Sequence, residues 1–139
     1  YLGKEQQNTE TASALNEISM YGPDATISYE DIIELNFQYI IRKDNNLLNI
    51  DGDNFKDIET QGALAELLIM PEGDDTKLYG AAMINYVQSD LAYLDYQTVT
   101  GHIGNLVRRN IRLCAEATYN FTDSDNAFAK FSLGIVSGF

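Results

Sequence analysis

Charged and amide side chains recur at alternate positions, and these are the residues whose types and spacing could do chemistry. Side chains two residues apart lie on the same face of a β-strand. The set with this pattern is Glu34, Asn36, Gln38, Arg42, Glu66, Arg112, Glu116, Thr118, Asn120 and Lys130. Such a face could line an aqueous passage and select ions by charge, and its mixed signs favour weak selectivity. The same residues could instead form a hydrogen-bonded wall with no transport role.

Motifs for catalysis are missing from the sequence, which has no nucleophile elbow, P-loop, HExxH or CxxC. His102 is the only histidine, and we interpret it as a structural or interior-facing residue. Cys114 is the only cysteine, so an internal disulfide is excluded. Cys114 falls among the polar residues of the alternating pattern, which indicates a small residue on the interior face. We therefore expect no enzymatic activity and no cofactor.

One acidic run, Asp51-Gly52-Asp53-Asn54, resembles part of a calcium loop. An EF-hand needs acidic or amide ligands at its first, third and fifth positions, then glycine at the sixth. Here Phe55 stands where the third ligand should be, and Gly52 is misplaced. A solvated turn is the simpler interpretation, with a loose divalent-ion site at a loop tip as the alternative. We expect no metal.

Composition narrows the classes of protein. The chain has 139 residues and a formal net charge of −12, which argues against nucleic-acid binding because that function needs a basic surface. Nine tyrosines and six phenylalanines with only two prolines suit long strands joined by polar turns. There is no run of 18 apolar residues, so no transmembrane helix is predicted.

The longest alternation predicts one strand over residues 24–43. Its apolar parity holds Ile27, Tyr29, Ile33, Leu35, Phe37, Tyr39 and Ile41, and is broken only by Asp31. Strands of globular sheets have a typical length of about five or six residues. Strands of a transmembrane barrel need about 9–11 residues for the hydrocarbon alone and project beyond it. A strand of this length therefore favours a barrel.

The C-terminal stretch 110–139 predicts a hairpin with one apolar and one polar face. Its apolar parity contains Tyr119, Phe131, Leu133, Ile135 and Phe139, and the polar TDSDN segment forms the turn. Transmembrane barrels show this alternation with the apolar face toward lipid. The hairpin resembles the closing hairpin of a Gram-negative outer-membrane β-barrel. In such proteins a final phenylalanine is the assembly signal, which is the role the resemblance implies for Phe139.

Six antiparallel strands are predicted in all. They cover residues 24–43, 58–70, 77–89, 96–107, 109–122 and 127–139. The run ETQGALAELLIM (59–70) has a helix-like local sequence, but its strand-like neighbours favour a strand. Residues 1–23 have weak periodicity and favour an irregular segment with a helical turn, although residues 13–20 could equally be the end of an earlier strand. Six strands cannot close a transmembrane barrel, because single-chain barrels begin at eight. We therefore expect the C-terminal part of a larger barrel.

If Phe139 lies in the periplasm, successive connections between the predicted strands lie on alternate sides of the membrane. The turns 71–76 and 108–110 are then periplasmic, and the loops 44–57, 90–95 and 123–126 are outside. The outer loops carry Asp51, Asp53, Asp57, Asp90, Asp95, Asp123 and Asp125. This acidic rim could bind divalent cations that bridge lipopolysaccharide, or it could simply be solvated.

Three runs carry a more specific resemblance, namely IELNFQYIIRKDN (33–45), residues 62–91 and RRNIRLCAEATYNF (108–121). In this order they resemble the C-terminal third of porin-type barrels of Gram-negative bacteria, over residues 24–139. The resemblance implies an outer-membrane channel for passive diffusion of small hydrophilic solutes. It also implies lipid and lipopolysaccharide as partners, with a homo-oligomer or a larger membrane complex as further options.

Two alternative functions stay open at this point. One is an outer-membrane barrel that acts as a scaffold or sleeve for a partner complex. The other is a soluble or surface β-domain used for adhesion or assembly, whose apolar parity would be buried in a core.

Overall fold

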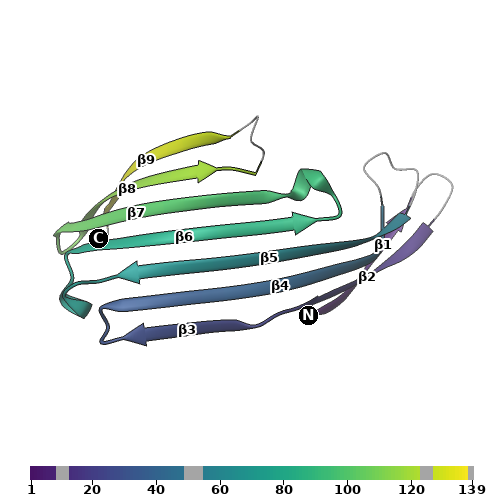
Figure 1. The fold of residues 1–139 in the computed structure, drawn as a ribbon, viewed down its shortest axis with the longest axis horizontal. Helices are drawn as coiled ribbons and strands as arrows, with labels where there is room; N and C mark the ends of the chain where they lie inside the picture. Colours follow the sequence, from purple (N-terminus) through teal and green to yellow (C-terminus); the bar gives the residue numbers. More distant parts are fainter. Residues whose placement is uncertain (9–12, 49–54, 123–126, 138–139) are drawn as a thin grey trace.

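The computed structural model describes residues 1–8, 13–48, 55–122 and 127–137. They form one antiparallel sheet (Figure 1). Its strands are β1 (Leu2–Asn8), β2 (Ser13–Tyr21), β3 (Asp24–Tyr29), β4 (Ile33–Leu48), β5 (Phe55–Ile69), β6 (Leu78–Ser89), β7 (Tyr96–Arg108), β8 (Ile111–Asn120) and β9 (Phe128–Ser137). Two 3-10 turns complete it, η1 (Gly73–Asp75) and η2 (Ala92–Leu94). Phe139 and the run 51–54 lie outside the described residues.

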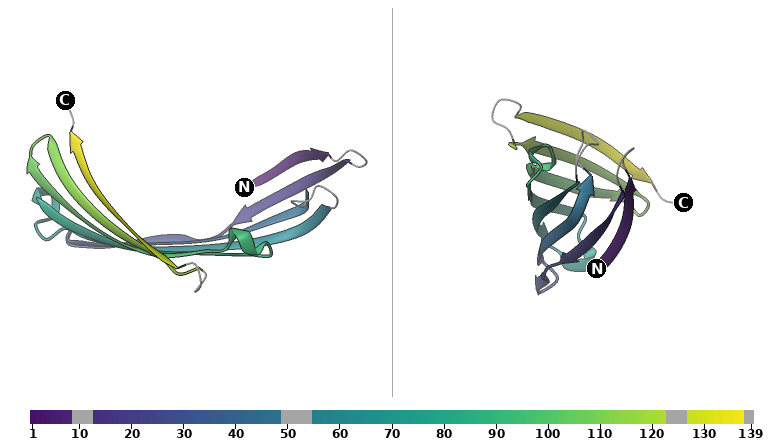
Figure 2. Two further views of the ribbon diagram at one scale, coloured as in Figure 1. Left: turned by 90° about the horizontal axis from the view of Figure 1, so that it is seen from above. Right: turned by 90° about the vertical axis from the view of Figure 1, so that its right-hand side faces the viewer.

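The sheet is an open, up-and-down arrangement. Its strand order is β1-β2-β4-β5-β6-β7-β8-β9, and β3 pairs with β4 on the same side as β2. The two ends of the sheet curl toward the same side, so that it forms a trough (Figure 2). The prediction of an all-β, antiparallel, up-and-down fold is confirmed. The sheet has nine strands, however, and it is not closed into a barrel.

The predicted strand 24–43 is in fact a hairpin of β3 and β4, so that prediction is wrong. Glu30 and Asp31 both have positive φ, at 49° and 54°, and the Ile32 amide donates to the Tyr29 carbonyl. Two successive positive φ values are typical of a type I′ turn. Tyr29 then pairs with Ile33, so the apolar parity is the same before and after the turn. Alternation therefore continues through the hairpin and conceals it.

Residues 1–23 were expected to be irregular, but those that the structure describes are mainly the strands β1 and β2. β2 continues into β3 along the same edge of β4, with Tyr21 opposite Ile41 and Asp24 opposite Gln38. Gly22 and Pro23 interrupt this line without shifting its register. The faces of β2 mix polar and apolar residues, so alternation gives no signal here. Pairing with the long β4 decides the conformation instead.

The remaining strands follow the predictions closely. The helix-like run 59–70 lies in β5, because pairing with β4 and β6 overrides its local propensity. The predicted loop 44–57 is shorter than expected, since β4 continues to Leu48 and β5 begins at Phe55. The described residues contain no long apolar helix of the kind that spans a bilayer.

The sheet has two chemically different faces and two different ends. What we call the apolar face includes Ile33, Leu35, Phe37, Leu67, Ile84, Val99, Ile103, Leu113, Phe131 and Leu133, which the register brings together. The polar face is the opposite one. At the turn end lie the β3–β4 turn, η1 and the β7–β8 turn, and at the loop end lies η2.

Burial is confined to the polar face. The buried side chains among the described residues are Asn16, Asp44, Ile58, Thr98 and Thr100, and the register places all of them on that face. The concave side of a curved sheet crowds its side chains, so we assign the polar face to the inside of the trough. On the apolar face Phe131 and Leu133 are 79% and 89% exposed. Within the described structure no second layer covers this face.

Candidate functional site

The sheet gathers all ten of the predicted lining residues on its polar face, with Thr118 between Thr100 and Lys130. Glu34 and Glu116 share one cross-strand row, Asn36, Glu66 and Lys130 the next, and Gln38 and Asn120 the third. Arg42 lies on the same face toward the loop end, and Arg112 lies on it toward the turn end. The shared face agrees with the prediction. A role for these residues in lining a passage stays a prediction.

Side-chain hydrogen bonds within and between neighbouring strands connect polar residues on this face. The Thr26 hydroxyl donates to Asn36 at 2.7 Å, and the Asn36 amide donates to Glu34 at 2.9 Å. Further along, the hydroxyls of Thr100 and Thr118 lie 2.9 Å apart. This pattern also fits the alternative of a hydrogen-bonded wall, so the two interpretations of the face remain open.

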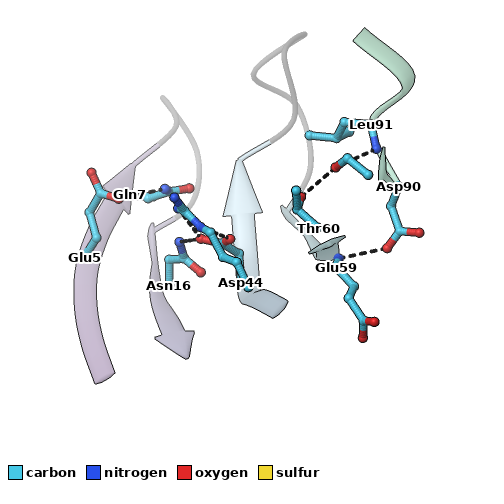
Figure 3. A network of polar contacts seen from close by, with 10 residues as sticks. Glu5, Gln7, Asn16, Asp44, Glu59, Thr60, Asp90 and Leu91 are labelled. Carbon is cyan, nitrogen blue, oxygen red and sulfur yellow. Dashed lines mark hydrogen bonds and ion pairs between the residues drawn. The ribbon is translucent and has the colours of Figure 1, made fainter. Parts of the chain in front are cut away.

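A buried ionic network occupies the loop end of the polar face (Figure 3). Arg42 donates from Nε to Asp44 Oδ2 at 2.6 Å and from Nη2 to Oδ1 at 2.8 Å. Asn16 Nδ2 donates to Asp44 Oδ1 at 2.9 Å. Asp44 is 3% exposed and Asn16 is fully buried. Arg42 was predicted for this face, whereas its partners Asp44 and Asn16 were not; the Arg42–Asp44 spacing of two along one strand is the signal that sequence analysis missed.

This network predicts acid-dependent stability. The hydrogen bond from Arg42 holds the pKa of the Asp44 carboxyl below its ordinary value, burial opposes this, and the Asn16 amide adds to it. A lowered folded-state pKa contributes stability above the unfolded pKa of about 3.9, and that stability is lost as the pH falls through the folded pKa. We expect Asp44→Asn to cost about 1–3 kcal/mol at pH 7. The difference from wild type should shrink below about pH 4.

Urea unfolding at pH 7 and at pH 3 measures this difference directly. Asp75→Asn in the exposed turn at η1 is the control, because its side chain belongs to no buried network. A penalty for Asp44→Asn that stays constant between the two pH values would show that the carboxylate charge does not stabilise the network.

A second cluster occupies the turn end of the polar face. The rings of Tyr79 and His102 stack with centroids 5.6 Å apart. The Arg112 guanidinium lies over the Tyr79 ring, 5.1 Å from its centroid. His102 Nδ1 lies 3.6 Å from Glu116 Oε2. Arg112 and Glu116 were predicted for this face and His102 was interpreted as structural or interior-facing, whereas Tyr79 is brought to them by strand register alone.

Glycine residues shape this cluster. Tyr79 lies opposite Gly104, and a Cβ at Gly104 would come within 2.2 Å of the Tyr79 ring. The aromatic ring therefore covers the glycine and is held flat on the sheet, a known device in designed sheets. Cys114 faces Gly134 in the same way, since a Cβ at Gly134 would meet its sulfur at 2.8 Å. This agrees with the interpretation of Cys114 as a small residue on the polar face.

The apolar face changes character toward the loop end. Tyr39, Ala63 and Tyr86 lie in one cross-strand row. The Tyr39 hydroxyl donates to Gln61 Oε1 at 2.8 Å, and the Tyr86 hydroxyl donates to Gln88 Oε1 at 3.0 Å. Both glutamines lie on the loop-end side of the tyrosines. The rings therefore lie near the loop end of the apolar band, and their hydroxyls point toward its polar border.

Ion pairs follow beyond this border on the same side of the sheet. Lys43 Nζ lies 2.8 Å from Glu59 Oε2, and Lys4 Nζ lies 2.6 Å from Glu17 Oε1. The hydrogen bond and charge of Lys43 lower the pKa of Glu59, and those of Lys4 lower the pKa of Glu17. From the turn end to the loop end, this face thus carries aliphatic side chains first, then aromatic rings, then amide side chains and finally charged side chains.

The acidic rim is only partly described. Asp90 accepts from the Glu59 amide at 2.9 Å, Asp95 from the Ser89 amide at 2.8 Å and Asp57 from the Asn46 amide at 3.0 Å. These carboxylates bind backbone groups of the strand ends. The other predicted rim residues, Asp51, Asp53, Asp123 and Asp125, lie outside the described residues. In the described ranges no group of three or more histidine, cysteine or acidic residues could hold a metal ion.

Comparisons with known proteins add no relative. No family model, no curated protein and no solved structure matches the chain.

Proposed function

We propose that the sheet is part of the wall of an outer-membrane β-barrel, with its apolar face toward lipid and its polar face lining a water-filled, porin-like channel for small hydrophilic solutes. The observation that carries this proposal is the apolar face itself, with side chains exposed by up to 89% at Leu133. Monomeric soluble proteins rarely expose apolar patches larger than a few hundred Å². Lipid is the partner that favours such a surface over the whole width of a sheet.

The dimensions of the apolar band support a bilayer as its partner. On β4 the band runs from Ile33 to Ile41, and on β6 from Leu78 to Tyr86. Each interval is about 27 Å along the strand, at about 3.4 Å per residue. Transmembrane strands need about 9–11 residues when tilted by about 45°. The tyrosine row at the loop end has the position and chemistry of an aromatic girdle.

The stagger of the strands supports a tilted wall. The row through Gln38 reaches Phe128 at the loop end of β9. The cross-strand row that contains Lys43 also contains Leu2, which is the residue of β1 nearest the turn end. β1 therefore lies wholly beyond β9 toward the loop end. Strands of a closed barrel shift along one another in this way because they tilt against the barrel axis.

The lengths of the connections give the proposed orientation. Two of the three connections at the turn end are tight turns, with three residues at β3–β4 and two at β7–β8, whereas the β5–β6 connection has eight and the β6–β7 connection at the loop end has six. Outer-membrane barrels have short periplasmic turns and longer extracellular loops, so the turn end is assigned to the periplasm. The edges of β1, β3 and β9 have free backbone groups within the described sheet. Further strands, from this or another chain, would close the wall and satisfy these groups.

A sleeve for a partner protein is the second candidate, and one feature favours it. Leu64, Leu68 and Met83 lie on the polar face at the centre of the sheet. A water-filled channel does not need apolar residues at these positions, whereas a bound partner could cover them. The two candidates differ in what the purified barrel does alone.

Liposome swelling tests the proposal and separates these candidates. The full chain is reconstituted into lipid vesicles, and floated vesicles are challenged with sugars of increasing size. A diffusion channel gives swelling that falls with solute size, whereas a sleeve gives either none or no size cut-off. Recovery of the chain as a monodisperse species without detergent, with no flotation, would contradict the membrane assignment.

A further inference from the structure

A cavity lies on the polar face at the turn end, next to the Tyr79 cluster. Its volume is about 330 Å³, and Arg112, Tyr79 and Leu68 line it on the sheet side. Met70 and Asp74, from the segment that joins β5 to β6, line the other side. Gly73 and Thr76 complete the lining, and the Thr76 hydroxyl already accepts a hydrogen bond from the Glu72 amide. The cavity therefore combines one guanidinium, one carboxylate and apolar side chains.

Arg112 is available to a ligand. The guanidinium rests on the Tyr79 ring, and Tyr79 is in turn held against Gly104. A stacked guanidinium keeps its N–H fork free for a planar carboxylate. By contrast, the guanidinium of Arg42 on the same face already binds Asp44 through two hydrogen bonds. Among the ion pairs of the described chain, none involves Arg112.

A side chain of opposite charge to Arg112 also lines the cavity. Asp74 lines the same cavity as Arg112, and the two side chains form no ion pair with each other in the described structure. The cavity that both residues line can therefore take a molecule that carries both charges. A simple anion would be repelled by Asp74, and a simple cation by Arg112. Leu68 and Met70 offer contact to an apolar substituent.

We propose that this cavity binds an α-amino acid zwitterion with an aliphatic side chain. Its carboxylate would accept hydrogen bonds from Arg112, its ammonium group would lie toward Asp74, and its side chain would pack on Leu68 and Met70. The inference deepens the channel function and rests on it for biological meaning. Passage through a channel needs binding that is weak enough to allow release, so the affinity is on the order of 1 mM.

Saturation-transfer NMR on the full chain in detergent tests the site without a membrane. L-leucine is titrated in parallel with L-leucinamide, which lacks the carboxylate, and with 4-methylpentanoate, which lacks the ammonium group. We expect each analogue to bind at least 10-fold more weakly than L-leucine. Equal binding of all three compounds would overturn the proposal.

Matched variants test the two charges. Arg112→Gln and Asp74→Asn are each expected to weaken L-leucine binding about 10-fold, since one charged contact is lost, and Arg112→Lys should retain part of it. The controls are Arg109→Gln and Asp75→Asn, which remove the same charges from neighbouring positions that do not line the cavity. Loss of binding in the controls, or its retention in both site variants, would overturn the assignment.

The test of the amino-acid site and the test of the channel can give different answers. Swelling with uncharged sugars reports the channel and does not depend on Arg112 or Asp74. If L-leucine binds and depends on both residues while the vesicles stay impermeable, the site stands and the channel fails. If sugars permeate but L-leucine does not bind, the channel stands and the amino-acid site is wrong.

Discussion

Phe37→Arg is expected to cost about 2–4 kcal/mol in the free energy of folding into a bilayer, the penalty for an arginine at the membrane midplane of a barrel. Phe37 lies at the centre of the apolar band on β4, with Ile33 and Ile41 at its two ends. Its side chain is 44% exposed, so the substitution creates no large cavity in the protein. The cost would therefore come from bringing the guanidinium into lipid. Urea titration of folding into lipid vesicles measures it.

The neighbouring position provides the control for this experiment. Gln38 is on the same strand but on the opposite face, so Gln38→Arg places the same charge at nearly the same depth inside the trough. We expect it to change the free energy of folding by less than about 1 kcal/mol. Equal penalties for Phe37→Arg and Gln38→Arg would show that the apolar face does not contact lipid. A penalty confined to the polar face would reverse the two assignments.

Alternation identified the faces of the sheet because a period of two is a purely local signal. It correctly grouped residues as distant in sequence as Glu34 and Lys130, since the register shifts of β4–β5 and β7–β8 lie near the strand ends and not in the rows that contain these residues. The same signal hid the β3–β4 hairpin, because the turn at Glu30 and Asp31 preserves parity. The break at Asp31 was visible in the sequence, and it is one of the two turn residues with positive φ.

Hydrophobic alternation did not predict the segments whose conformation is determined by pairing with another strand. β2 has no consistent apolar face, and it is held by backbone pairing with β4 along one edge and with β1 along the other. For the same reason the candidate cavity could be foreseen only in part. Arg112 was assigned to the polar face from its parity, but Asp74 lies in a connection whose path no period describes. Tyr79 becomes informative only once Gly104 is known to lie opposite it.

Gly22→Ala is expected to destabilise the sheet by about 1–3 kcal/mol or more, the range for overpacking a site that cannot relax. A Cβ at Gly22 would lie 1.7 Å from the Tyr39 carbonyl oxygen and 2.7 Å from its carbonyl carbon. The obstacle is backbone rather than a flexible side chain, so β4 itself would have to move. The adjacent hydrogen bond from the Tyr39 amide to the Pro23 carbonyl, at 2.9 Å, would be strained by that movement.

The comparison with Gly101→Ala separates this clash from a general effect of replacing glycine. Gly101 lies in β7, and a Cβ there would meet nothing within 4 Å. Alanine at such a position should be neutral or stabilise by about 0.4–1 kcal/mol, because the unfolded chain loses freedom. Urea unfolding of both variants in detergent measures the contrast. If Gly22→Ala were as stable as Gly101→Ala, β2 and β3 could not lie against β4 in one continuous line, and the strand order at this edge would be wrong. A large loss at Gly22 alone would show that close backbone contact with Tyr39 fixes the junction of β2 and β3.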